Sequence, residues 1–152
     1  MPVDVLTEVV IDRPRREVAD FAAAPDNAPR WYENIEAVEW KTDPPVTVGS
    51  RVGFAARFLG RRLTYTYEIT SFRPGELLVM ATREGPFPME TTYTWIDTAD
   101  GGTRMSLRNR GEPSGFSKIG SRMMTAAIRR ANRKDLAKLK QIVESAPPPS
   151  AE

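Results

Sequence analysis

The sequence predicts an α+β domain in which a curved antiparallel sheet of about seven strands wraps around one long C-terminal helix. Hydrophobic and polar residues alternate with period two in several short segments, a pattern typical of strands with one buried face. Two short helical segments separate the first of these strands from the others. From residue 114 to 145 the hydrophobic period changes to about 3.6 residues, which is typical of an amphipathic helix.

The N-terminal segment predicts one strand followed by two short helices. Residues 3–11 carry valine, threonine or isoleucine at every odd position, so one side of this strand is expected to be buried. Asp12 is placed to cap the helix that follows, and Pro14 falls where a first helical turn tolerates proline. Pro25-Asp26-Asn27 begins a second short helical piece that extends to Trp31 and Tyr32.

Six further strands are expected after these helices, and turn signals separate them. Leu59-Gly60 predicts a tight hairpin, Pro74-Gly75 a type II turn, and Asp100-Gly101-Gly102 a second hairpin. Asp43-Pro44-Pro45 interrupts the pattern with a loop. Consecutive strands joined by short turns pair in opposite directions, so the sheet is expected to be antiparallel. The expected strands are 35–42, 52–58, 63–70, 76–83, 89–95 and 104–109.

The C-terminal helix is expected to lie on the apolar face of the sheet. Its register drifts near Asn132 and Asp135, which predicts a bend and places Leu136 on an intermediate face. Because the short helices hold one end of the long helix away from the sheet, we expect a cavity between helix and sheet. Residues 1–145 form the predicted domain, and the proline-rich segment 146–152 is predicted to be a disordered tail. The expected apolar stripe of the helix is Phe116, Ile119, Met123, Ala127, Ala131, Leu139 and Ile142.

The composition excludes several kinds of chemistry, because the chain has no cysteine and no histidine. Disulfides, thiol nucleophiles, Cys/His zinc sites, Ser-His-Asp triads and histidine acid–base pairs are therefore ruled out. We expect no cofactor and no metal. Glu33, Glu36 and the tyrosines remain as candidate acids or bases. Both glutamates lie beside a loop, where a carboxylate is usually solvated, so no catalytic residue is assigned.

Positive charge is concentrated in the second part of the chain. Residues 1–50 carry ten acids and five bases, whereas residues 51–152 carry ten acids and seventeen bases. Such a basic surface can bind phosphates, but no aromatic stacking residues lie between the charges, so a nucleic-acid partner is not expected. Arginines that pair with Glu68 and Glu90 across strands give a solvated outer face instead. The basic residues are Arg51, Arg57, Arg62, Arg104, Arg108 and Arg110 on the strands, and Lys118, Arg122, Arg129, Arg130, Arg133, Lys134, Lys138 and Lys140 on the helix.

The sequence contains no apolar run of the roughly 20 residues that a membrane span requires. Its first residues include acids where a signal peptide needs a basic start, so a cytoplasmic protein is expected. An exposed sheet edge or helix flank would support a homodimer.

Polar-tipped aromatic residues are expected on the concave side of the sheet. Tyr65, Tyr67 and Tyr93 share that side with Thr91 and Asn109. A buried phenol needs a partner for its hydroxyl, so these groups either orient the oxygen atoms of a ligand or hydrogen-bond to one another in a filled core. Apolar aromatic and methionine side chains, Phe87 among them, would line the rest of the cavity. The expected ligand-binding residues are Trp31, Phe54, Phe58, Tyr65, Tyr67, Met89, Thr91, Tyr93, Trp95, Asn109, Met123 and Ala127.

Several short pieces of sequence, in their order, resemble one known superfamily. They are residues 31–35 (WYENI) before 38–40 (VEW), 48–51 (VGSR), 85–90 (GPFPME), 101–104 (GGTR) and 135–140 (DLAKLK). From about residue 3 to 144 the chain resembles the START-like helix-grip superfamily, specifically its bacterial polyketide cyclase/dehydrase group, also called SRPBCC. A cystatin-like cone is the alternative fold, but its long helix usually precedes the strands.

The resemblance implies a deep pocket between sheet and C-terminal helix for an apolar small molecule. Members of the superfamily range from enzymes to lipid carriers, so the resemblance does not by itself imply catalysis. We expect the protein to bind a small hydrophobic molecule of polyketide-like or lipid-like character. The alternatives are a cyclase, aromatase or dehydratase that works through tyrosine hydroxyl and asparagine amide groups, and a basic module that binds nucleic acid or protein.

Overall fold

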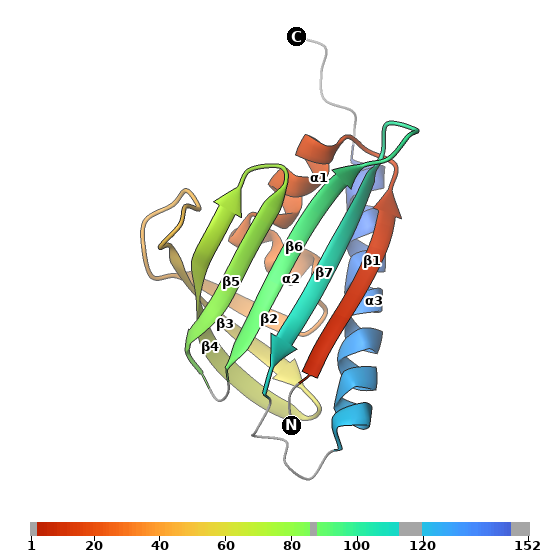
Figure 1. Cartoon of the computed structure of the whole chain (residues 1–152). Coiled ribbons are helices and arrows are strands. Elements are labelled where there is room, and N and C mark those ends of the chain that lie inside the picture. The colour runs from red at the N-terminus through yellow and green to blue at the C-terminus, as the bar shows by residue number, and fades with distance from the viewer. Residues whose placement is uncertain (1–2, 86–87, 113–119, 147–152) are drawn as a thin grey trace.

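The computed structural model describes residues 3–85, 88–112 and 120–146. Figure 1 shows a curved sheet with its helices on the concave side and α3 beside its edge strand β1. The elements in chain order are β1 (Val3–Ile11), α1 (Arg15–Ala22), the 3₁₀ helix η1 (Pro25–Asn27), α2 (Ala28–Trp31), β2 (Ile35–Trp40), β3 (Arg51–Phe58), β4 (Arg61–Arg73), β5 (Leu77–Glu84), β6 (Met89–Asp97), β7 (Thr103–Gly111) and α3 (Ser121–Ser145).

All seven strands form one antiparallel sheet in the order β1-β7-β6-β5-β4-β3-β2. Strands β2 to β6 each pair with the next strand along the chain, as the short turns predict. The first strand closes the other edge by pairing with the last, with Val3 opposite Gly111 and Ile11 opposite Thr103. The helix-grip architecture expected from the sequence is therefore confirmed.

Two of the predicted turns have the backbone conformations that their residues require. Leu59 and Gly60 both have positive φ, 52° and 78°, as a two-residue hairpin of the twist-matched type requires. Gly75 has a φ of 78°, and the Glu76 N–H donates a hydrogen bond of 2.9 Å to the Arg73 carbonyl, as in a type II turn.

The predicted cap of α1 is wrong. Pro14 occupies the N-cap position, and no side chain caps the helix. The helix begins at Arg15, so Asp12 lies too far ahead of the first turn to serve as its cap. The Asp12 backbone N–H instead donates to the Glu144 carboxylate at 2.7 Å, which ties this segment to the end of α3.

The buried face of α3 also differs from the predicted stripe. Residues 121–145 form one helix, and Leu136, expected on an intermediate face, is fully buried. Met123 is 69% exposed, whereas the neighbouring Met124 is buried. The face that packs inward is thus rotated by about one residue, roughly 100° on a helix. Its buried residues are Met124, Ile128, Asn132, Asp135, Leu136, Leu139 and Val143. Phe116, Lys118 and Ile119, and residues 147–152 of the predicted tail, lie outside the described residues.

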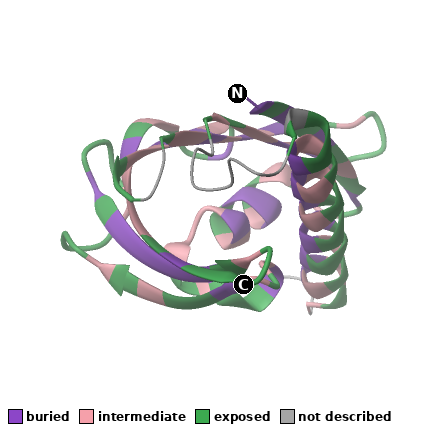
Figure 2. Cartoon of the chain, turned by 90° about the horizontal axis from the view of Figure 1, so that it is seen from below, coloured by how far each residue is buried: buried purple, intermediate pink, exposed green. Residues whose placement is uncertain are grey.

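The interior between the sheet and α3 is filled at one end by α1. Val18, Ala19 and Ala22 of α1 pack with Trp95 and Met105 of the sheet and with the C-terminal half of α3. In Figure 2 the sheet curls around the short helices, and α3 stands across its open side. None of the described helices is long and apolar enough to cross a membrane.

Candidate functional site

A cavity of about 180 Å³ lies between the concave face of the sheet, α2 and the N-terminal half of α3. Strands β3 to β7 each contribute side chains to its wall, and α3 contributes Met124, Ile128 and Ala131. Most of the wall is apolar. The sequence predicts a cavity between helix and sheet at this place. α2 lines the cavity, whereas α1 packs mainly in the filled end of the interior.

One side of the cavity is an aromatic wall on two paired strands. Phe54 of β3 lies directly opposite Tyr65 of β4 in the strand register. Their ring centroids are 5.6 Å apart, and those of Tyr65 and Tyr67 are 5.1 Å apart in an edge-on arrangement. Because side chains two residues apart share a face of a strand, the alternating sequence of β4 places both tyrosines in the cavity wall.

From Tyr67 of this aromatic wall runs a chain of hydrogen bonds that we call the polar network. The Tyr67 and Thr91 hydroxyl groups are 2.9 Å apart. The Asn109 amide donates to the Thr91 hydroxyl at 2.9 Å, and the Asn132 amide donates to the Asn109 side-chain oxygen at 2.6 Å. The network therefore links β4, β6 and β7 to α3. These groups hydrogen-bond to one another. This is the second of the two roles expected from the sequence, the first being direct contact with a ligand.

The Tyr65 hydroxyl lies outside the polar network. Unlike the hydroxyl groups of the network, it makes no hydrogen bond with any described residue. The Tyr65 side chain lines the cavity, and its hydroxyl is not sealed away from the cavity space. A polar group in an apolar wall without a partner is costly unless something in the cavity bonds to it. This hydroxyl is therefore available to a ligand.

A second pair of phenols closes the cavity near α2. The hydroxyl oxygens of Tyr32 and Tyr93 are 2.6 Å apart, so one donates to the other. Tyr32 was not among the predicted site residues, because it follows a helix of only four residues and belongs to no alternating pattern. It lines the cavity together with Tyr93.

Asp135 is the carboxylate among the described residues of the cavity wall, and sequence reasoning missed it. It is only 3% exposed, and its Oδ1 accepts a hydrogen bond of 3.1 Å from the Glu33 backbone N–H. Burial raises the pKa of Asp135 to about 6, and the nearby Glu33 charge adds to the rise, whereas the Glu33 N–H and Lys134 oppose it. The signal that could have found it is its spacing: it lies on one helical face with Asn132 and Leu139.

The phenols of the cavity hold their protons at neutral pH. Burial raises the pKa of Tyr67 to about 12, and it raises the pKa values of Tyr32, Tyr65 and Tyr93 well above the ordinary value for tyrosine. These groups can therefore donate or accept hydrogen bonds but cannot serve as bases. Asp135, by contrast, can gain or lose a proton close to neutral pH.

The predicted site residues divide into two groups. The structure does not place the first group in the cavity wall: Trp31 and Trp95 are packed in the core beside α1, Met123 points to the solvent, and Ala127 is turned away. Phe87 lies outside the described residues. The predicted residues that do line the cavity are Phe54, Phe58, Tyr65, Tyr67, Met89, Thr91, Tyr93 and Asn109.

The two glutamates considered as acids or bases are on the surface. Glu36 lies 2.6 Å from Arg57, and Glu33 lies 3.3 Å from Lys134. Both side chains are substantially exposed. Within the described parts of the chain, no three acidic side chains come together in a group that would hold a metal ion.

Comparison with known proteins agrees with this architecture. The model of a family described as "Polyketide cyclase / dehydrase and lipid transport" matches residues 2–144. A START superfamily protein from Mycobacterium smegmatis has a similar structure, with a TM-score of 0.79 at 12% identity over 93% of this chain and 97% of that one. The Zhui aromatase/cyclase from Streptomyces sp. R1128 has a TM-score of 0.76 at 17% identity over 95% and 94% of the two chains.

The ginseng major latex-like protein 151 from Panax ginseng has a TM-score of 0.70 at 13% identity, with 95% of this chain and 96% of that one covered. At these identities the similarity shows a shared fold. No curated protein is similar enough in sequence to match the chain.

Proposed function

This chain belongs to the polyketide cyclase/dehydrase and lipid transport family, and we propose that it binds a small, mostly hydrophobic molecule in the cavity between the sheet and α3. The observation that carries the proposal is the cavity wall itself. It is largely apolar and aromatic, and its polar groups with bonding capacity to spare include the Tyr65 hydroxyl and the Asp135 carboxylate. Small-molecule sites typically combine an apolar wall with a few such groups.

The volume limits what the cavity accepts in this state. At about 180 Å³ it is close to the roughly 150 Å³ of a cavity that holds one benzene molecule. A ring-sized compound or a short acyl segment fits without rearrangement. A polyketide of several rings or a longer lipid requires wall side chains to move, and Met80, Met89 and Met124 are flexible enough to do so.

The proposed ligand contacts follow from the wall. Phe54, Phe58 and Met89 supply apolar surface. Tyr65 donates a hydrogen bond to an oxygen of the ligand, and Asp135 bonds to a hydroxyl or an amine of the ligand. The groups of the polar network already bond to one another, so their main role is to hold this side of the cavity in shape.

A matched pair of substitutions on α3 tests the proposal. Ala131 lines the cavity, whereas Ala126 is exposed on the other side of the same helix. Binding of a fluorescent naphthalene-sulfonate dye is to be measured for Ala131→Phe and Ala126→Phe, with native mass spectrometry of the purified protein to detect a co-purified ligand. We expect Ala131→Phe to weaken dye binding at least about tenfold, or about 1.4 kcal/mol. Equal binding by both folded variants would contradict the proposal.

Asp135 favours a second candidate function, which is a reaction in the same cavity. A carboxylate with a pKa of about 6 is close to what a general base needs at neutral pH. It can remove a proton from a carbon beside a ligand carbonyl, and the Tyr65 hydroxyl can donate a hydrogen bond to the enolate oxygen that forms. Cyclase, aromatase and dehydratase reactions include steps of this kind.

The Asp135→Asn variant separates the two functions. Asparagine keeps an oxygen that accepts from the Glu33 N–H but cannot take a proton. If the protein only binds, affinity for the dye, which does not depend on a bond to Asp135, should change by less than about threefold, or about 0.7 kcal/mol. If it catalyses, turnover of an enolisable test substrate should fall at least about 100-fold, within the usual range for removing a general base. Tyr65→Phe, Tyr67→Phe and Tyr93→Phe test the hydroxyls in the same assay.

A further inference from the structure

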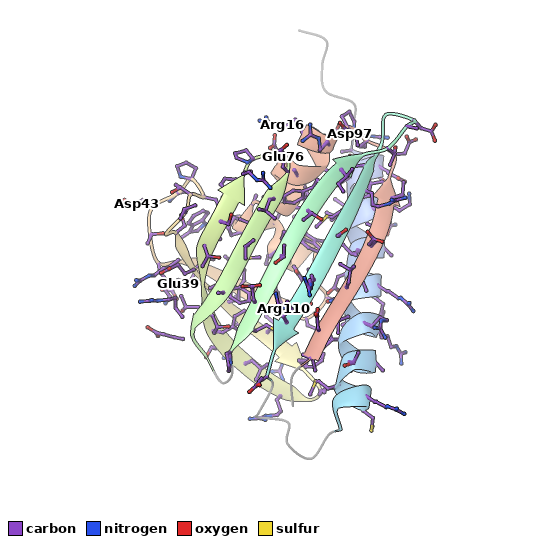
Figure 3. All side chains as sticks on the ribbon, in the orientation of Figure 1. Arg16, Glu39, Asp43, Glu76, Asp97 and Arg110 are labelled. Carbon is purple, nitrogen blue, oxygen red and sulfur yellow. The ribbon has the colours of Figure 1, made fainter. Side chains whose placement is uncertain are left out.

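The exposed side of α3 carries a surface that the cavity does not explain, which we call the basic face. Between residues 122 and 138 its exposed side chains include no acid, because the one acid of this stretch, Asp135, points inward. The helix rises about 1.5 Å per residue, so the charges extend along about 24 Å. Figure 3 shows the nitrogen-tipped side chains of α3 projecting away from the sheet. The basic face consists of the exposed Arg122, Arg130, Arg133, Lys134 and Lys138 and the half-buried Arg129.

The outer face of the sheet is also rich in arginine, but there most of the arginines are paired with acids. Arg51 lies 3.2 Å from Glu68, and Arg110 lies 3.9 Å from Glu90, so the cross-strand pairing predicted from the sequence is confirmed. Arg108 forms two hydrogen bonds with the Asp4 carboxylate, at 2.8 and 2.6 Å. These acids neutralise the sheet face locally.

The basic face has almost no such neutralisation. Within the described residues, Lys134 pairs with Glu33 at 3.3 Å, and the other five cations form no ion pair. Five unpaired cations on one side of a helix repel one another, and an anionic surface placed against them removes that repulsion. The arrangement therefore fits an extended anionic partner better than a single bound ion.

We propose that the basic face docks onto the surface of an anionic phospholipid bilayer. Small side chains such as Ala126 and Ala137 separate the cations, and none of the described exposed residues of α3 is aromatic, so the stacking that single-stranded nucleic acid needs is missing. Met123, exposed beside Arg122, is an apolar side chain that a membrane interface accommodates. The apolar side of α3 is already buried in the protein, so the docking is electrostatic and does not require the helix to insert.

The basic face and the cavity wall lie on two sides of the same helix, α3. The same helix contributes Met124, Ile128 and Ala131 to the cavity wall, one to four residues from the cations. A bilayer bound along α3 therefore lies beside the helix that closes the cavity. The proposal stands whether or not the cavity binds a ligand, because it rests on charges outside it.

The test compares two variants with equal change in net charge. Arg122, Arg129, Arg130 and Arg133 are changed together to Gln in one variant, and Arg51, Arg57, Arg108 and Arg110 in the other. Co-sedimentation is measured with vesicles of phosphatidylcholine alone and with about one-third phosphatidylglycerol, because only the second attracts cations. Each cation near such a surface contributes about fivefold in affinity, so the helix variant should lose about 100-fold or more.

We expect the unchanged protein to bind only the anionic vesicles and to release them as salt rises. The sheet variant should bind within about threefold of the unchanged protein. Circular dichroism and thermal melting verify that both variants are folded. An equal loss in both folded variants would show that net charge alone governs binding and would overturn the proposal. Tighter binding to single-stranded RNA than to the anionic vesicles at the same salt would also overturn it.

Discussion

The two ends of the interior behave differently although the same sheet and the same helix form both. At one end, which we call the packed end, Leu136, Leu139 and Val143 of α3 lie in one buried cluster with side chains of α1 and of the sheet. At the other end, which we call the hollow end, Met124 and Ile128 of α3 line the cavity. α1 is only eight residues long: Val18 and Ala19 pack at one end of the interior, and the helix ends at Ala22, which borders the cavity. The hollow therefore lies beyond the end of this short helix.

The largest expected effect tests whether the packed end carries more of the stability. Leu139 is fully buried, so Leu139→Ala leaves a new cavity among close neighbours and should cost about 3–5 kcal/mol in free energy of unfolding. Ile128 packs with Val3 and Val5 but also borders empty space, so Ile128→Ala should cost less, about 2 kcal/mol. Urea denaturation of both variants measures the difference. Equal costs would mean that the hollow end is packed in solution.

The next effect concerns Asp135, which lies where the packed and hollow ends meet. Its pKa in the fold, about 6, is above the ordinary 3.8, so the folded protein binds the proton more tightly than the unfolded chain. Stability from this group is therefore fully present below about pH 4 and is lost as the pH rises through about 6. Asp135→Asn should raise stability by up to about 3 kcal/mol at about pH 8 and by almost nothing at about pH 4.

Thermal melting across this pH range is the appropriate measurement for Asp135→Asn. The Glu33 charge near Asp135 adds to the effect, and Lys134 reduces it. A stability difference between the two proteins that does not change with pH would show that Asp135 is solvated and that the cavity is open to water at this point.

A third comparison adds volume at each end. Ala19 of α1 is 1% exposed at the packed end, so Ala19→Leu should overpack and cost about 1–3 kcal/mol. Ala131 faces the cavity, so Ala131→Leu should cost less than about 0.5 kcal/mol or should stabilise slightly by filling space. Chemical denaturation measures the free energy of unfolding of the two variants. A larger loss for Ala131→Leu than for Ala19→Leu would contradict a hollow interior at Ala131.

The smallest effect separates two tyrosines of the hollow end. The Tyr32 hydroxyl bonds to that of Tyr93, so Tyr32→Phe should cost about 1 kcal/mol. The Tyr65 hydroxyl has no partner among the described residues, so Tyr65→Phe should leave the stability of the ligand-free protein within about 0.5 kcal/mol. If Tyr65→Phe costs more, the hydroxyl is already bonded within the protein and is not available to a ligand.

The sheet face of the site was predicted from sequence more accurately than its helix face. A strand has only two faces, so alternation assigned Tyr65, Tyr67 and Tyr93 to the concave side without ambiguity. A helix allows many faces, and a stripe drawn through Met123 instead of Met124 turned the prediction by about 100°. That rotation left Asn132 and Asp135 out of the predicted inward face, so the residue with the most distinctive chemistry was missed.

The sequence by itself determined the order of the elements, the antiparallel pairing and the inward side of each strand, because turns and alternation act between residues close in the chain. It did not determine that Trp95 is packed while Tyr93, two residues earlier on the same face, lines the cavity. That depends on how far α1 reaches along β6. The pKa of Asp135 likewise depends on desolvation by distant segments, and only the tertiary structure brings those segments together.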